Sequence, residues 1–131
     1  MDKAELKQRT KKFAIDIIRF IEELPHKHSL DILSRQLLRS STSIGANYRS
    51  ACRGKSTADF INKIIIVEEE ADESVYWLEL MEESGLVVSA NLTQLKREAN
   101  EFTAIFTAIG KTAKEKQRIS KSKIKIGRSI N

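Results

Sequence analysis

Apolar side chains recur at intervals of three and four residues in four successive segments of this 131-residue chain. That spacing puts them on one stripe of an α-helix, and the stripes must be buried against one another. The segments span residues 5–24 and 30–53, the stretch from Ser56 to Gly85, and a stretch that starts near residue 91. The sequence therefore predicts an all-α fold with four helices.

The residues between these segments are typical of helix ends. Pro25 ends the first segment, because proline cannot continue a helix, and Ser29 is expected to cap the second. Gly54 suits the left-handed position that closes a helix. Ser56, which has an acidic residue three positions later, and Asn91 are expected to cap the third and fourth helices. Gly110 either ends the fourth helix or lies in a final frayed turn.

Short connections favour neighbouring helices that run in opposite directions, so we expect an antiparallel up-and-down four-helix bundle. Residues 40–46 contain several serines, a threonine and a glycine, which are poor helix formers. We interpret them as small residues that let another helix approach closely. Core packing is expected for Leu33, Leu37, Ile44, Phe60, Leu78 and Phe102.

Size and composition fit one cytoplasmic domain. A chain of 131 residues can bury one core without disulfides, and its single cysteine, Cys52, cannot form an internal one. No segment has the roughly 18 apolar residues of a membrane span, and the charged N-terminus does not resemble a secretory signal. We expect no membrane association, no metal and no cofactor.

Charge is divided into three blocks. Residues 1–55 hold 12 Lys/Arg against 6 Asp/Glu, residues 56–101 hold 3 against 11, and residues 102–131 hold 8 against 1. The start of the first helix and the end of the fourth should meet at one end of the bundle and merge their lysines into one patch. Residues 1–117 are expected to form the bundle, and residues 118–131 a flexible basic tail without helical spacing.

Arg35, Arg39, Arg49 and Arg53 share one face of the second predicted helix, opposite its apolar stripe. They either pair with carboxylates of a neighbouring helix or subunit, or bind phosphates, for which the planar guanidinium group is well suited. Pairing is expected for Arg39 and Arg49, with Glu70 and Glu73 among the acidic partners. The residues expected to contact nucleic acid are Arg35, Arg53, Lys11, Lys12, Lys114, Arg118, Lys121 and Lys123.

The third predicted helix carries large apolar residues on two opposite faces, and one bundle covers only one of them well. We therefore expect a homo-oligomer, since aromatic and arginine residues are enriched at the centres of interfaces. The alternative is that the aromatic residues only edge the core of one protomer. The expected interface residues are Arg39, Arg49, Glu69, Asp72, Glu73, Tyr76, Trp77 and Leu80.

Enzyme motifs are weak in this sequence. His26 and His28 stand two positions apart beside a proline and do not share a helix face. Arg19 and His26 have the Arg-x6-His spacing of the helical HEPN ribonucleases, although Pro25 intrudes and the surrounding pattern is missing. We expect a non-enzymatic protein, with a HEPN-like ribonuclease as one alternative and a protein interaction scaffold without nucleic acid as the other.

The motifs RQLLRS at 35–40, SIGANYR at 43–49 and ACRGKS at 51–56 continue downstream in EADES at 70–74 and YWLEL at 76–80. With these motifs the chain resembles the bacterial four helix bundle proteins encoded in intervening sequences of 23S rRNA genes, often labelled a ribosomal protein. The resemblance is sharp over two helices and looser from residue 5 to about 115. It implies a helical bundle without an assigned biochemical role.

Some relatives of that family resemble the accessory subunits of diversity-generating retroelements, which are homopentameric bundles that bind a reverse transcriptase and nucleic acid. This resemblance implies a ring-like homo-oligomer and a reverse transcriptase as a partner. Taken with the basic patch, it leads us to expect an oligomeric bundle that binds RNA or DNA as an accessory to a nucleic-acid enzyme.

Overall fold

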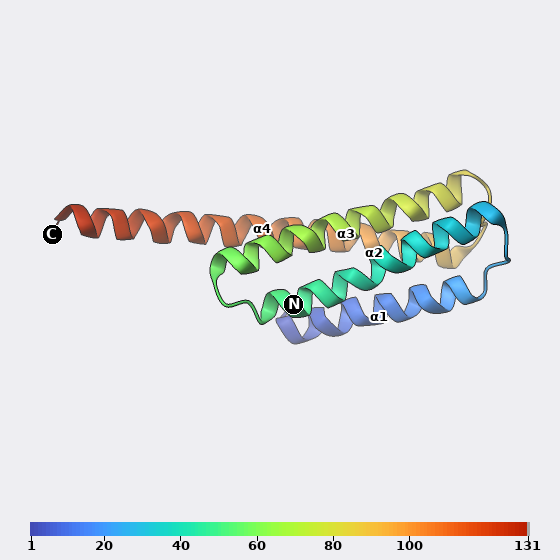
Figure 1. Ribbon diagram of the computed structural model, residues 1–131, viewed down its shortest axis with the longest axis horizontal. Coiled ribbons are helices and arrows are strands. Elements are labelled where there is room, and N and C mark those ends of the chain that lie inside the picture. The colour runs from blue at the N-terminus through green and yellow to red at the C-terminus, as the bar shows by residue number, and fades with distance from the viewer. Residues whose placement is uncertain (131) are drawn as a thin grey trace.

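The computed structural model describes the backbone of residues 1–130 and the side chains of residues 1–127. Within these residues there are four helices and no strand: α1 (Lys3–Glu22), α2 (His28–Cys52), α3 (Thr57–Glu83) and α4 (Ala90–Ile130). The four helices lie side by side in one bundle, and consecutive helices are joined at alternate ends (Figure 1). The all-α fold expected from the apolar spacing is confirmed.

Two of the expected helix ends are confirmed. The Ser56 hydroxyl accepts a hydrogen bond from the Asp59 backbone N–H at 3.1 Å and caps α3. Gly85 follows α3 with a φ of +75°, a left-handed conformation in which glycine avoids the steric cost of a side chain. An additional cap that the sequence analysis did not single out is Asp2, whose carboxylate accepts from the Glu5 N–H at 2.8 Å.

Three other expected ends are wrong. Ser29 lies inside the first turn of α2, because the Asp31 N–H already donates to the Lys27 carbonyl at 2.8 Å. Gly54 does not have a positive φ, because its N–H closes the end of α2 by donating to the Ala51 carbonyl at 3.0 Å. α4 begins one residue before Asn91, whose N–H donates to the Ser89 hydroxyl at 3.1 Å.

The predicted apolar stripes meet in one core. Phe13 of α1 packs edge-on against Phe102 of α4, with ring centroids 5.4 Å apart, and Tyr48 of α2 lies against Phe106. Four of the six expected core residues, Leu37, Ile44, Leu78 and Phe102, are fully buried. Leu33 and Phe60 are half-buried and pack against the edge of this core.

The small residues of α2 allow close contacts with two helices, as predicted. A Cβ atom added at Gly45 would lie 3.3 Å from the Thr10 hydroxyl of α1. On the α3 side, the buried hydroxyls of Ser40 and Ser74 are hydrogen-bonded at 2.8 Å. Local helix propensity is sacrificed here for close packing, which the flanking apolar residues stabilise.

α4 continues far beyond the other helices and projects from the bundle as a single helix (Figure 1). Gly110 does not end it but lies buried within it, and its Cβ position would be 3.6 Å from Ile64. The expectation that helical structure is lost after residue 117 is wrong for the described residues. Lys, Arg, Gln and Glu are good helix formers, and Glu115 and Arg118 pair one turn apart.

The division between a bundle at 1–117 and a flexible segment at 118–131 stays a prediction, and Asn131 and the side chain of Arg128 lie outside the described residues. None of the helices within residues 1–130 combines the length and the apolar character that a membrane crossing requires.

Candidate nucleic-acid interface

Three lysines from separate parts of the chain meet at the end of the bundle from which α4 projects. Lys3 lies at the start of α1, Lys55 in the connection between α2 and α3, and Lys116 in α4, and all three line one hollow of about 690 Å³. The start of α1 and the basic part of α4 therefore lie together, as the sequence predicted.

The hollow has an apolar wall beneath its basic rim. The half-buried ring of Phe60 forms part of the wall, and the Lys3 ammonium lies 5.9 Å from the ring centroid. The wall also contains Ile109 and several residues with small side chains, which leave the space open: Ala51, Cys52, Gly54, Ala108 and Ala113. Gly54 is closely surrounded, because a Cβ there would lie 2.8 Å from the Asp59 carboxylate and 3.0 Å from the Ala51 carbonyl oxygen.

Most cations at this end have no acidic partner. Among the side chains described through residue 127, no carboxylate lies within salt-bridge distance of Arg53, Lys55, Lys114, Lys116, Lys121 or Lys123. Arg118 differs, because it binds Glu115 at 2.5 Å, and its hydrogen bond lowers the pKa of that carboxyl below its usual range. The uncompensated lysines form a positive surface that extends from the hollow along α4.

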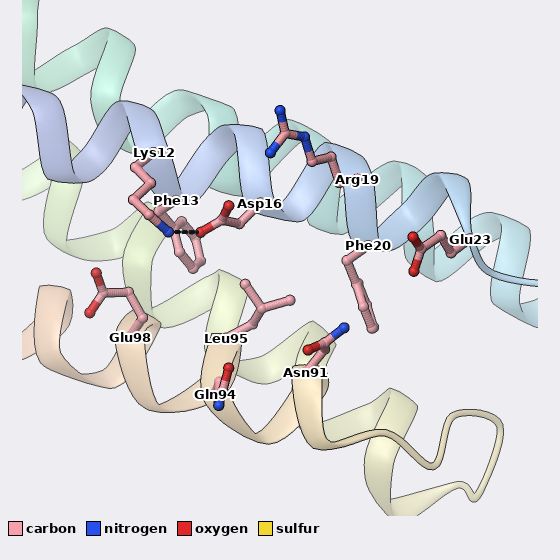
Figure 2. A pocket seen from close by; sticks show the side chains of 10 residues that line it. All are labelled: Lys12, Phe13, Asp16, Arg19, Phe20, Glu23, Asn91, Gln94, Leu95 and Glu98. Carbon is pink, nitrogen blue, oxygen red and sulfur yellow. Dashed lines mark hydrogen bonds and ion pairs between the residues drawn. The ribbon is translucent and has the colours of Figure 1, made fainter.

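The groove between α1 and α4 has a different character. It has a volume of about 570 Å³, and Phe13, Phe20 and Leu95 project into the space between the two helices (Figure 2). Lys12, expected at the nucleic-acid surface, lines this groove and pairs with Asp16 at 2.6 Å. Lys11 is exposed on the same helix.

Acidic groups line this groove and pair with Lys12 in it and with Arg9 beside it. Arg9 donates two hydrogen bonds to Glu98, at 2.9 and 2.5 Å, and also pairs with Glu101. The hydrogen bond with Glu98 is the main reason why the pKa of Arg9 is raised. Because carboxylates compensate the positive charge here, the α1–α4 groove is a poorer site for a polyanion than the lysine-rimmed hollow.

The arginine stripe of α2 divides into paired and unpaired members. Arg39 pairs with Glu73 of α3, and its guanidinium lies 3.5 Å from Glu70, so it links two helices of one chain. The other three, Arg35, Arg49 and Arg53, are exposed and have no acidic partner among the described residues. Arg39 therefore fits the expected pairing with carboxylates, whereas Arg35, Arg49 and Arg53 are candidates for binding phosphates or the carboxylates of another subunit.

One carboxylate beside Arg39 is incompletely satisfied. The Oε2 atom of Glu70 is buried and has no hydrogen-bond partner in the described part of the chain. Burial raises the pKa of Glu70, and the nearby Arg39 only partly opposes that rise. Trp77 completes the cluster by donating its indole N–H to Glu73 at 3.2 Å.

The outer face of α3 carries apolar residues next to acidic ones. Tyr76 is 53% exposed and Ile66 41% exposed, while Glu69 and Asp72 are exposed between them. Trp77 and Leu80 are half-buried; Trp77 packs against the core on one side and against Tyr76 on the other, with ring centroids 5.2 Å apart. One protomer therefore leaves part of the expected interface uncovered.

The residues of the ribonuclease alternative are apart within one chain. Arg19 lines the α1–α4 groove, whereas His26 lines a hollow next to α2 and lies 3.3 Å from Asp31. Within the described residues, no group of three His, Cys, Asp or Glu side chains is placed to hold a metal ion.

The hollow itself was missed by sequence reasoning. Lys3 and Lys116 belong to the basic runs recognised in the sequence, but Lys55 and Phe60 were not connected with them. The available signal was the Gly-Lys-Ser break after Arg53, which places a lysine between two helix ends at the basic end of the bundle.

Comparison with known proteins agrees with this fold. The model of the 23S rRNA-intervening sequence protein family matches residues 2–108. The chain belongs to this family. The matched region of this 23S rRNA-intervening sequence protein stops within α4, before Lys111, so the projecting part of α4 lies beyond it.

A solved structure also resembles this family member. It is the crystal structure of a protein of unknown function from the S23 ribosomal protein family of Bacteroides thetaiotaomicron VPI-5482, with 34% identity and a TM-score of 0.77. The similarity covers 85% of this chain and 99% of the other. None of the curated proteins compared with the chain matches it. The family predicted from the motifs of α2 and α3 is confirmed.

Proposed function

We propose that this 23S rRNA-intervening sequence protein is a non-enzymatic, self-associating bundle in the cytoplasm that binds RNA or DNA through its basic end. One observation carries the proposal: Lys3, Lys55 and Lys116 converge on one hollow, and Lys121 and Lys123, which have no acidic partner among the described residues, follow along α4, which projects from the bundle (Figure 1). Placing phosphates there releases counterions without breaking internal ion pairs. In this proposal the protein is an accessory to a nucleic-acid enzyme such as a reverse transcriptase, and it binds the RNA or DNA on which that enzyme acts.

The proposed assembly is a ring of antiparallel up-and-down bundles. Connections at alternate ends of the bundle support the antiparallel course (Figure 1). The exposed Tyr76 and Ile66 on the outer face of α3 support self-association, because large apolar side chains next to each other favour an interface. The unpaired Arg49 and the acidic residues of that face supply the complementary charges. A ring repeats the basic end of each protomer and raises its avidity for a polyanion.

A salt titration of binding to labelled single-stranded RNA and DNA tests the nucleic-acid part of this proposal. We expect affinity at low salt for both, and a steep fall as salt rises, because each neutralised phosphate releases a bound counterion. Negligible binding at low salt refutes it and favours the interaction scaffold. Cleavage of the RNA that disappears in a His26→Ala variant refutes the non-enzymatic assignment and favours the ribonuclease.

The substitution Tyr76→Glu tests self-association. Glutamate adds a charge at an exposed residue that is also surrounded by acidic groups, so it should separate protomers without disturbing the core. Ile18, which is 43% exposed on α1, is the matched control in an Ile18→Glu variant. Light scattering should report a smaller particle for the first variant only. Equal masses for the parent and Tyr76→Glu proteins would show that this face is not the interface.

A further inference from the structure

The lysine-rimmed hollow has the size and the chemistry of a pocket for a flat ring. Its volume of about 690 Å³ leaves room for a nucleobase between α3 and α4. Phe60 contributes a half-buried aromatic ring, with the Lys3 ammonium 5.9 Å from its centroid, and the small side chains of Ala108 and Ala113 of α4 also line the hollow. Bases of single-stranded nucleic acids bind in this manner, by stacking on aromatic side chains next to a positively charged surface.

The rim supplies the charge that a nucleotide needs beside its base. Lys3, Lys55 and Lys116 line the hollow from three separate parts of the chain, and all three are exposed. The hydroxyls of Thr57 and Thr112 also line the hollow and are suited to hydrogen-bond the edge of a base. The first backbone N–H groups of α3, at Thr57, add partial positive charge on the same side.

The apolar wall distinguishes this hollow from a surface that carries lysines alone. Lysines alone bind phosphates whether or not a base is present, and they do not need the half-buried Phe60 and Ile109 in the same hollow. An accessible aromatic residue next to several cations is typical of surfaces that bind single strands rather than duplexes. The α1–α4 groove, which is similar in size, has acidic groups at its rim and lacks this combination.

We propose that the hollow holds one unpaired nucleobase, stacked on Phe60, while Lys3, Lys55 and Lys116 bind the flanking phosphates. This inference rests on the proposed function and adds a preference to it. The protein discriminates a strand with unpaired bases from an abasic strand or a duplex with the same phosphates.

The test compares a labelled 20-nucleotide single strand with an abasic strand of equal length and with a duplex, using fluorescence anisotropy at one salt concentration. The parent protein should bind the single strand about 5- to 150-fold more tightly than the abasic strand, the range expected for one stacked base. The variant Ala108→Leu fills the hollow from α4 and should bring this ratio close to one. Ala104→Leu makes the same change one turn earlier, outside the hollow, and should retain the parent ratio.

The possible failures are distinguishable. If the parent binds the normal and abasic strands equally, or if Ala108→Leu retains the parent ratio, the base pocket is refuted and the proposed function stands. If the parent binds neither strand at low salt, both proposals are refuted. Circular dichroism of the Ala108→Leu and Ala104→Leu variants checks that each remains folded. The variant Phe60→Leu, which keeps an apolar side chain but removes the ring, should also lower the ratio of single-strand to abasic-strand affinity.

Discussion

Removal of the lysine rim should reduce nucleic-acid binding by an amount that the structure lets us estimate. In the triple variant Lys3→Gln, Lys55→Gln and Lys116→Gln, three cations that line one hollow lose their charge. Each phosphate contact on a single strand contributes about 0.7 to the slope of log affinity against log salt, so three contacts contribute about 2. At about 0.1 M salt this corresponds to an affinity roughly 100-fold lower than that of the parent.

The charge-matched control changes three exposed cations that lie away from the hollow, in Arg19→Gln, Lys27→Gln and Arg97→Gln. Arg19 lies 16 residues after Lys3 in α1, and Arg97 lies 19 residues before Lys116 in α4. At about 1.5 Å per residue, these separations exceed two Debye lengths of about 10 Å, so loss of the three control charges should change the affinity little. Anisotropy titrations at four salt concentrations give the slope for each protein. An equal loss of slope in both triple variants would mean that net charge, rather than the lysine-rimmed hollow, governs binding, and it would refute the reasoning.

Three further predictions concern stability, measured by denaturant or thermal unfolding. Gly110→Ala should stabilise the fold by about 1 kcal/mol, because alanine is the better helix former and its Cβ meets only an ordinary contact at 3.6 Å. In Gly45→Ala the new Cβ lies 3.3 Å from an α1 hydroxyl, so this variant should gain less stability. Equal gains in the two variants would contradict this account. Ser40→Ala and Ser74→Ala should each cost about 1 kcal/mol, and the double variant should cost less than their sum, since both changes remove the same buried hydrogen bond; strict additivity would argue against that bond. Burial raises the pKa of Glu70 above its value in the unfolded chain, so protonated Glu70 adds to the free energy of unfolding at low pH, and this contribution is lost as pH rises through the folded-state pKa. Glutamine stays neutral, so the Glu70→Gln variant should gain stability relative to the parent toward neutral pH. A difference that stays constant across pH would exclude this linkage.

Helix ends show why sequence patterns place an element better than its boundaries. Ser56 was recognised as a cap because a serine followed by an acidic residue at the third position favours one local geometry. Ser29 and Asn91 are equally good caps in isolation, yet the helices begin one residue or more before the expected starts. Several polar residues near a helix start compete for the cap position, and the packing of the first turn selects among them.

The candidate site was predictable only in part. The charge distribution and the up-and-down connectivity of a bundle were sufficient to predict that the start of α1 and the basic part of α4 lie at the same end. The Gly-Lys-Ser break placed Lys55 at the basic end, but no sequence signal connected Phe60 with a hollow, because the shape of the hollow depends on small side chains from α2 and α4 that lie more than 50 residues apart. The pairing of Lys12 with Asp16 one turn away could be read from the sequence spacing, whereas the assignment of Lys12 to the nucleic-acid surface stays a prediction.

By itself, the sequence determined the helical fold, the core stripes and the family, because periodic apolar spacing and local motifs encode them along one segment at a time. Only the tertiary structure decided that α4 continues as a projecting helix, that Arg39 is paired while Arg49 has no acidic partner among the described residues, and that three lysines line one partly apolar hollow. These features depend on distances between residues far apart in the chain, and such distances are set by how the four helices pack, not by any one segment.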